Sequence, residues 1–136
     1  MFNNYLGDKI VPLTADNIPK QSWTPRARRN MPPPPARQIP VLFFSATRSS
    51  HAGTIYFKAV NASGSPQKVD ITLKGAQKVS PGGLLVSLSS ANPADTNSIT
   101  EPMKIVPVSS KISGIAPSFS QTLAPYSVNV FQIEAQ

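Results

Sequence analysis

Cysteine is absent from the 136-residue sequence, and histidine occurs once, at His51. Disulfide scaffolds, thiolate zinc sites and cysteine nucleophiles are therefore excluded, as is a cluster of histidines around a metal. We expect His51 to be a turn residue rather than a catalytic base, because serine, alanine and glycine flank it. Charged residues make up 14% of the chain, against about 25% in an average globular protein, which argues against coiled coils and helical bundles.

Long apolar runs are also missing, and none approaches the roughly 18 residues of a membrane helix. Residues 1–8 have neither the basic stretch nor the apolar core of a signal peptide. Full disorder is excluded because 40% of the residues are hydrophobic and charge is sparse. We therefore expect a folded domain with no membrane partner, no cofactor and no metal.

Positive charge is concentrated in the first third of the chain. The net charge is +7: residues 1–50 hold seven basic and two acidic residues (+5), and residues 51–136 hold six and four (+2). Arg26, Arg28 and Arg29 could grip phosphates, so a basic nucleic-acid-binding protein is one alternative. We favour a solvated basic linker and expect no nucleic-acid partner, because such modules interleave exposed aromatics with charge and only Trp23 is near.

Proline is the most conspicuous residue that is present, with 15 copies. Pro25, Pro32 to Pro35 and Pro40 forbid a helix over residues 22–40 and remove donors from any β-ladder. Four prolines in a row favour an extended polyproline II segment. The pattern predicts a linker or a surface excursion in this region, not core.

Beyond residue 40 the sequence is typical of short β-strands. Residues 68–74 alternate, with Val69, Ile71 and Leu73 on one face, as in a half-buried antiparallel strand. Turn residues at 51–53, 61–66 and 81–83 separate such segments. Roughly seven to nine strands with this spacing indicate a β-sandwich. The expected strands are 41–47, 54–60, 68–74, 84–88, 105–108, 111–115, 118–123 and 127–133.

The last strand carries apolar residues on both faces, with Val128 and Val130 on one and Phe131 and Ile133 on the other. A strand in a two-layer sandwich needs a further partner when both faces are apolar. One sheet is therefore expected to pack on something outside this chain or on the chain's own N-terminal arm. We predict Phe131 and Ile133 as the packing face toward such a partner.

Several segments resemble a known family in order along the chain. Residues 53–61 read GTIYFKAVN, similar to the GTIYLKVVN strand of α-L-arabinofuranosidases of glycoside hydrolase family 51. The loop 88–102 resembles the family's L-x-x-x-x-P-x-D-x-N-S-x-x-x-P loop, and 104–107 resembles the KVVP that follows it. Residues 123–130 are similar to the closing PPYSVTVL strand, and 1–8 to the MFSxNxGD end of the last barrel helix.

This resemblance implies the C-terminal part of a hydrolase that removes terminal non-reducing α-L-arabinofuranosyl residues from arabinan and arabinoxylan, in L-arabinose metabolism. It implies a remnant of the last catalytic-barrel helix over 1–8, a strand plus Pro/Arg-rich linker over 9–40, and an antiparallel, jelly-roll-like β-sandwich over 41–136. The partner would be the (β/α)8 catalytic barrel, whose two glutamates have no counterpart here. The parent is expected to be secreted or periplasmic and often oligomeric.

The residues themselves indicate no catalytic site. Asp95 and Glu101 share one loop and are the only candidate carboxylate pair, but Asp95 is expected to form local turns. A stand-alone carbohydrate-binding module is a second alternative, since Tyr56 and Trp23 could contact sugar. Asn61-Ala62-Ser63 is a glycosylation sequon, with meaning only in a secreted eukaryotic chain. We therefore predict that this stretch alone is inactive and structural.

Overall fold

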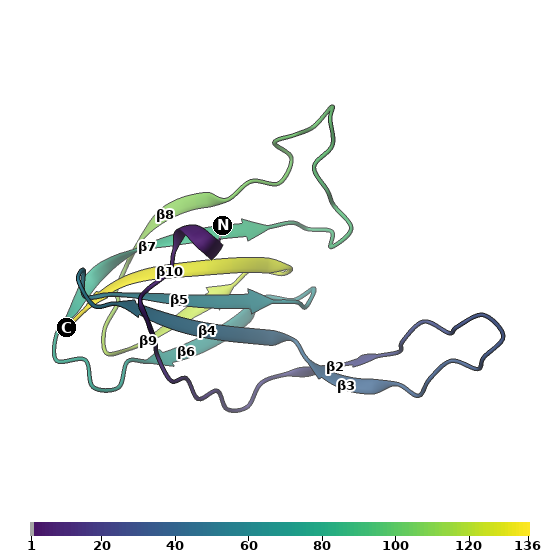
Figure 1. Cartoon of the computed structure of the whole chain (residues 1–136), viewed down its shortest axis with the longest axis horizontal. Helices are drawn as coiled ribbons and strands as arrows, with labels where there is room; N and C mark the ends of the chain where they lie inside the picture. The colour runs from purple at the N-terminus through teal and green to yellow at the C-terminus, as the bar shows by residue number, and fades with distance from the viewer. Residues whose placement is uncertain (1) are drawn as a thin grey trace.

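The computed structural model describes residues 2–136 and is almost entirely antiparallel β-structure (Figure 1). A single-turn 3-10 helix, Phe2–Asn4, precedes ten strands. The prediction of an all-β sandwich is confirmed. The strands are β1 (Lys9–Ile10), β2 (Lys20–Trp23), β3 (Arg37–Pro40), β4 (Leu42–Ser49), β5 (Thr54–Asn61), β6 (Gln67–Thr72), β7 (Val79–Ser89), β8 (Val108–Ser113), β9 (Ser118–Leu123) and β10 (Ser127–Ala135).

The strands form one large sheet and two small ones. The large sheet has the order β1-β4-β5-β10-β7-β8, with β10 at its centre, while β6 pairs with β9 and β2 pairs with β3. The β6–β9 sheet supplies Val69, Ile71, Phe119 and Leu123 to a core shared with β4, β5 and β10. We call the side of the large sheet that contributes to this core the covered face, and the opposite side the open face.

Local sequence explains the two strands of the second layer. In β6 the alternation of buried Val69 and Ile71 with exposed Lys68, Asp70 and Thr72 is the predicted pattern. In β9, Phe119 and Leu123 are buried, while the serines and Thr122 are exposed. Period-two patterning therefore confirms both strands, since one face meets the core and the other meets water.

Phe131 and Ile133 correct one prediction. They lie on the covered face of β10, where they are 1% and 0% exposed and belong to the same core as β6 and β9. They pack inside the chain and leave no surface for an external partner. The even-numbered residues Val128 and Val130 lie on the open face instead, because successive side chains alternate along a strand.

Residues 81–83 correct a second prediction, since Pro81-Gly82-Gly83 lies within β7 rather than in a turn. A Cβ at Gly83 would stand 2.7 Å from the Gln132 carbonyl oxygen and 2.7 Å from Ile115 Cδ1, so only glycine fits. The register between β10 and β7 shifts at this level. Glycine and proline therefore mark a β-bulge with close backbone approach, a recognised alternative to a turn.

The predicted strand over 105–108 is also wrong, because β8 begins only at Val108 and continues to Ser113. Ile105 and Val106 belong to the long loop that precedes it. Both are half-buried, which explains why their apolar side chains resembled a strand. These two side chains pack against the rest of the molecule, but the backbone here forms no hydrogen-bonded β-ladder and is therefore not a strand.

The proline-rich region is a surface excursion, as predicted, but its base is ordered. β2 and β3 pair in register from Lys20↔Pro40 to Trp23↔Arg37 and project away from the rest of the molecule (Figure 1). Pro40 occupies the last paired position of this two-stranded ribbon, where a missing N–H is tolerated. Residues 24–36 form the loop at the far end. We call residues 20–40 the arm.

The N-terminal segment is attached across the edge of the large sheet. Gly7 N–H donates to Thr47 Oγ1 over 3.1 Å, and Ser50 N–H donates to an Asp8 carboxylate oxygen over 2.7 Å. A Cβ at Gly7 would lie 2.2 Å from the Arg48 carbonyl carbon, so the crossing requires glycine. The segment then continues as β1, which pairs with β4.

Candidate functional site

The open face carries an apolar row that runs across four strands. Backbone register aligns Phe43 of β4 with Val60 of β5, Val60 with Val128 of β10, and Val128 with Leu88 of β7. Phe43 is 50% exposed, and the other three are half-buried. We call these four residues the apolar row. Large side chains that share one exposed row of a sheet indicate a contact surface.

The N-terminal segment covers only the neighbouring part of the open face. In Figure 1 the 3-10 helix lies over the middle of the large sheet, and Tyr5 stands 6.2 Å from Tyr56 between ring centroids. Next to the apolar row, Val130 and Val86 are 0% and 3% exposed. The N-terminal segment around Tyr5 therefore covers this portion of the open face, and the apolar row lies beyond it.

A groove of about 280 Å³ lies over the apolar row. Val60, Val128 and Leu88 line it from the sheet, while residues of the long loop between β7 and β8 line it from the side, among them Pro93, Asp95 and Ile105. The wall and floor are thus mostly apolar, with one carboxylate at the side. Its volume lies just below the roughly 300–1,000 Å³ of small-molecule pockets, and a contiguous apolar surface at this place suits packing against a protein segment.

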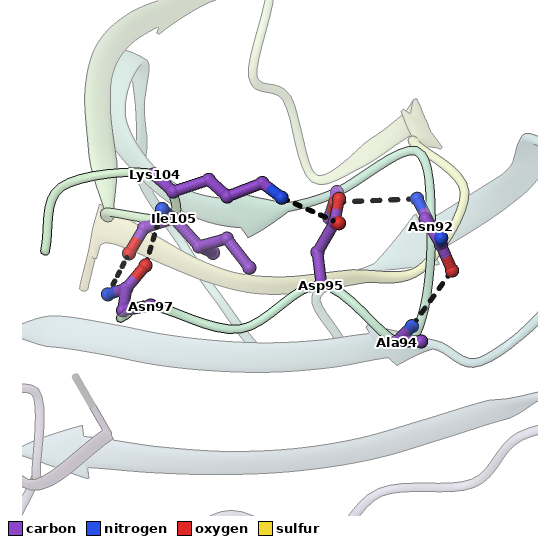
Figure 2. A network of polar contacts seen from close by, with 7 residues as sticks. Asn92, Ala94, Asp95, Asn97, Lys104 and Ile105 are labelled. Atoms are coloured by element: carbon purple, nitrogen blue, oxygen red, sulfur yellow. Dashed lines mark hydrogen bonds and ion pairs between the residues drawn. The ribbon is translucent and has the colours of Figure 1, made fainter. Parts of the chain in front are cut away.

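The wall of the groove is held in shape by its own hydrogen bonds. Asn97 forms two of them with the Ile105 backbone: its amide nitrogen donates to the carbonyl oxygen over 2.9 Å, and its amide oxygen accepts from the N–H over 2.7 Å (Figure 2). These bonds therefore hold together two parts of the loop that are eight residues apart in the sequence. This asparagine belongs to the Asn-Ser loop that carried the family resemblance.

Asp95 closes the same loop through a hydroxyl and an ammonium group. Ser90 Oγ donates to one of its carboxylate oxygens. Lys104 Nζ lies 3.1 Å from the other carboxylate oxygen, as Figure 2 shows. The Ser90 hydrogen bond, followed by Lys104, lowers the pKa of Asp95 below its ordinary value. A general acid for glycoside hydrolysis needs a raised pKa, whereas these contacts shift the pKa of Asp95 in the opposite direction. Glu101 is exposed further along the loop.

Asn61, at the end of β5, is a buried polar anchor rather than a modification site. It is 1% exposed, and its amide nitrogen donates to the carbonyl oxygens of Ser65, Leu123 and Ala124 at 2.9, 3.3 and 2.9 Å. Its amide oxygen accepts from the N–H and hydroxyl of Ser63. The sequon is therefore enclosed, and it joins the end of β5 to the corner before β10.

The two residues predicted as possible sugar contacts lie in different places. Tyr56 is on the open face, half-buried, with Tyr5 beside it. Trp23 is 47% exposed at the end of β2, on the arm. The structure does not bring them together. Tyr126, at φ 45°, lies at the corner before β10, where its hydroxyl would be 2.8 Å from a Cβ at Gly64.

Three further observations concern residues 2–136 as a whole. No three histidine, aspartate or glutamate side chains in this range gather as metal ligands would. His51 is exposed in the turn between β4 and β5, as predicted. Within the same range no helix has the length and hydrophobicity to cross a membrane.

The fold defines an antiparallel β-sandwich domain of the kind carried by glycoside hydrolases. The chain is similar to the family 44 xyloglucanase of Paenibacillus polymyxa, at 14% identity over 74% of this chain and 18% of that one, with a TM-score of 0.53. At this identity the similarity concerns the fold alone. No protein-family model and no curated protein matches the chain.

The structural neighbours include α-L-arabinofuranosidases of glycoside hydrolase family 51, which confirms the resemblance drawn from the sequence. The enzyme of Thermotoga petrophila RKU-1 aligns at 21% identity with a TM-score of 0.79, over 97% of this chain and 27% of that one. The arabinose-bound enzyme MgGH51 aligns at 29% identity with a TM-score of 0.66, over 71% and 15%. The chain therefore spans about a quarter or less of these proteins.

Proposed function

We propose that this chain is the C-terminal accessory sandwich of an α-L-arabinofuranosidase and that it packs through its open face on the catalytic barrel. The parent would hydrolyse terminal non-reducing α-L-arabinofuranosyl residues of arabinan and arabinoxylan. The observation that carries the proposal is the apolar row, which the chain itself covers only in part. In this arrangement residues 1–8 would belong to the last barrel helix, 9–40 would link, and 41–136 would form the accessory domain.

The positions of the carboxylates support a structural role for this stretch. Retaining glycosidases hold two carboxyl groups about 5–5.5 Å apart, one with a raised pKa. Asp95 has a lowered pKa because of Ser90 and Lys104, and Asp8 has one because it accepts a hydrogen bond from Ser50. Both are occupied in holding loops. The reacting carboxylates would therefore be supplied by the barrel.

The loop above the groove extends the proposed contact surface. Ile99 and Met103, at its far end, are 101% and 73% exposed, although both are apolar. The Asn97–Ile105 and Asp95–Lys104 contacts fix the base of the loop from which they project. Exposed apolar side chains on a braced loop are typical anchors for a neighbouring domain. The apolar row and the loop together would form one interface.

The first test asks whether the 136-residue chain acts alone. Purified chain is incubated with a chromogenic α-L-arabinofuranoside, and we expect no release of the chromophore. Turnover that persists through purification would contradict the proposal. Sequencing the DNA upstream of the Met1 codon is the companion test: an in-frame barrel sequence supports the proposal, and a promoter directly before the codon opposes it.

The second test targets the apolar row. In the isolated chain, Val128→Lys should lower binding of a hydrophobic fluorescent dye several-fold, because it places an ammonium group in the centre of the row. Thr72→Lys is the matched control, since Thr72 is exposed on the outer side of β6 and should leave dye binding unchanged. Equal dye binding by the wild type and Val128→Lys would mean that the row is not an exposed apolar surface.

A stand-alone carbohydrate-binding module is the second candidate, and Tyr56 is the residue that tests it. Such a module would bind neutral arabinan as the isolated chain and would lose that binding in Tyr56→Ala. Tyr5 already occupies one side of Tyr56 at 6.2 Å between ring centroids, which favours the accessory role. Binding of arabinan that depends on Tyr56 would favour the module instead.

A further inference from the structure

The far end of the arm contains a second groove, separate from the open face. It has a volume of about 550 Å³ and is lined by Trp23, Arg26, Arg28, Met31, Pro34 and Arg37, among others. Trp23 and Arg37 stand opposite each other in the last paired position of β2 and β3. The ordered base of the arm therefore places an exposed indole beside guanidinium groups.

Local backbone structure holds the loop of the arm in a turn. Met31 N–H donates to the Arg28 carbonyl oxygen over 3.0 Å, and Asn30 has a φ of 65°. Asparagine tolerates this left-handed conformation better than most residues. The turn leaves Arg28 and Met31 on the same groove, with Met31 63% exposed. The arginines are thus presented on a folded hairpin.

The charge of this groove is uncompensated. Arg26, Arg28, Arg29 and Arg37 lie within twelve positions, and the sequence contains no acidic residue from position 17 to position 69. Within residues 2–136 the one ion pair joins Lys104 and Asp95, far along the chain from the arm. Three of these arginines, Arg26, Arg28 and Arg37, line the groove together with the exposed Trp23. They suit an anionic ligand, since arginine binds planar carboxylates through paired hydrogen bonds.

We propose that the arm groove binds a carboxylated polysaccharide, with Trp23 packed on the apolar face of a sugar ring and the arginines on uronic acid carboxylates. The polysaccharide class rests on the proposed function, because the parent would act on plant-type sugar polymers. The carboxylate requirement rests on the arm alone. A neutral sugar chain offers no charge to pair with the three arginines of the groove, whereas a uronate polymer supplies one carboxylate per residue.

Two other occupants fit the arm less well. A second copy of the chain would bring a net charge of +7 toward the three arginines of the groove, which disfavours association. A single-stranded nucleic acid would need several aromatic platforms along a basic track, whereas Trp23 is the one aromatic residue between positions 6 and 42. A uronate polymer needs only one platform with carboxylates nearby.

The test measures binding of the full 136-residue chain to two polymers that differ only in charge. De-esterified polygalacturonate is the probe, and fully methyl-esterified polygalacturonate is its neutral counterpart. We expect at least tenfold tighter binding to the de-esterified form at low salt, weakening as the salt concentration rises from about 50 to 200 mM. Single-stranded DNA of similar length serves as an anionic polymer without uronates.

Matched variants separate the groove from general positive charge. The triple variant Arg26→Gln/Arg28→Gln/Arg37→Gln should weaken binding about tenfold or more. Lys68→Gln/Lys74→Gln/Lys111→Gln removes the same charge from exposed positions elsewhere and should change affinity less than about threefold. Trp23→Ala keeps all the charge and should still weaken binding several-fold. The thermal midpoint of each variant checks that the sandwich remains folded.

The outcomes are distinct. Equal binding of both polygalacturonates, no binding at all, or equal losses in the arginine and lysine variants would each overturn the proposal. Tighter binding to single-stranded DNA than to polygalacturonate would overturn it in favour of a nucleic-acid partner. None of these results depends on hydrolysis of an arabinofuranoside or on a barrel upstream, so a failure here is separate from a failure of the proposed function.

Discussion

The two faces of the large sheet differ in what completes them. On the covered face, β6 and β9 seal Phe131 and Ile133 to 1% and 0% exposure. On the open face, the N-terminal segment covers the middle, and the apolar row stays at the surface with Phe43 half exposed. The chain thus buries the covered face completely at these residues, whereas the apolar row of the open face remains partly exposed. Burial within the chain stabilises the covered face, while the apolar row is the surface on which we propose that the catalytic barrel packs.

The largest expected effect on stability comes from truncating a large core side chain on the covered face. Phe131→Ala should lower the free energy of unfolding by about 3–5 kcal/mol, because it removes a buried ring and leaves a cavity between the layers. Val128→Ala, on the same strand but the open face, should cost about 1 kcal/mol or less. Urea denaturation of the isolated chain measures both. Similar losses would mean that the two faces are equally buried, and the comparison would fail.

The next effect concerns the polar corner of the covered face. Asn61→Ala should destabilise the chain by about 2–3 kcal/mol, because three carbonyl oxygens lose a donor and Ser63 loses its acceptor. Asn92→Ala is the control, since Asn92 is exposed and its side chain accepts one loop hydrogen bond, from the Ala94 N–H. Thermal or urea unfolding distinguishes them. A loss at Asn61 no larger than that at Asn92 would show that the buried network is dispensable.

The smallest effect concerns the wall of the open groove and its response to pH. Because the folded-state pKa of Asp95 is lowered from 3.8, its contribution to loop order is present above that value and is lost as the pH falls through the folded pKa. A carbon-13 NMR titration should find the Asp95 pKa below 3.8, and Ser90→Ala should raise it more than Lys104→Ala does. Lys74→Ala should leave it unchanged. A measured Asp95 pKa at or above the ordinary value would mean that Ser90 and Lys104 do not hold the Asp95 carboxylate in the wall of the groove.

Strand periodicity could predict much of the fold, and the exceptions have physical causes. The limits of β9 match the sequence expectation because its alternation is strict and both ends meet turn residues. Gly82 and Gly83 suggested a turn, but they mark a bulge where the backbones of β7 and β10 approach closely. The paired base of the arm was missed, because Lys20–Trp23 and Arg37–Pro40 are exposed and carry no apolar alternation.

The candidate site could be predicted only in part. The two apolar faces of β10 were evident from the alternation of Val128 and Val130 with Phe131 and Ile133. So was the need for a packing partner on each of these faces. The sequence of one strand cannot say which face the chain covers itself, since that depends on where β6 and β9 cross. The apolar row needs the register of four strands, which brings Phe43, Val60 and Leu88 beside Val128.

The enclosed amide of Asn61 has a consequence for synthesis in a secretory pathway. A glycosyltransferase would find this asparagine only before the corner between β9 and β10 closes over it, because the folded chain leaves 1% of the residue accessible. A sugar on the amide nitrogen would replace one of its two hydrogens and would occupy the place of the three carbonyl oxygens that this nitrogen now faces, which would keep the corner from closing. A glycan at this position is therefore incompatible with the folded corner, and a chain that carried one would have to leave this corner open.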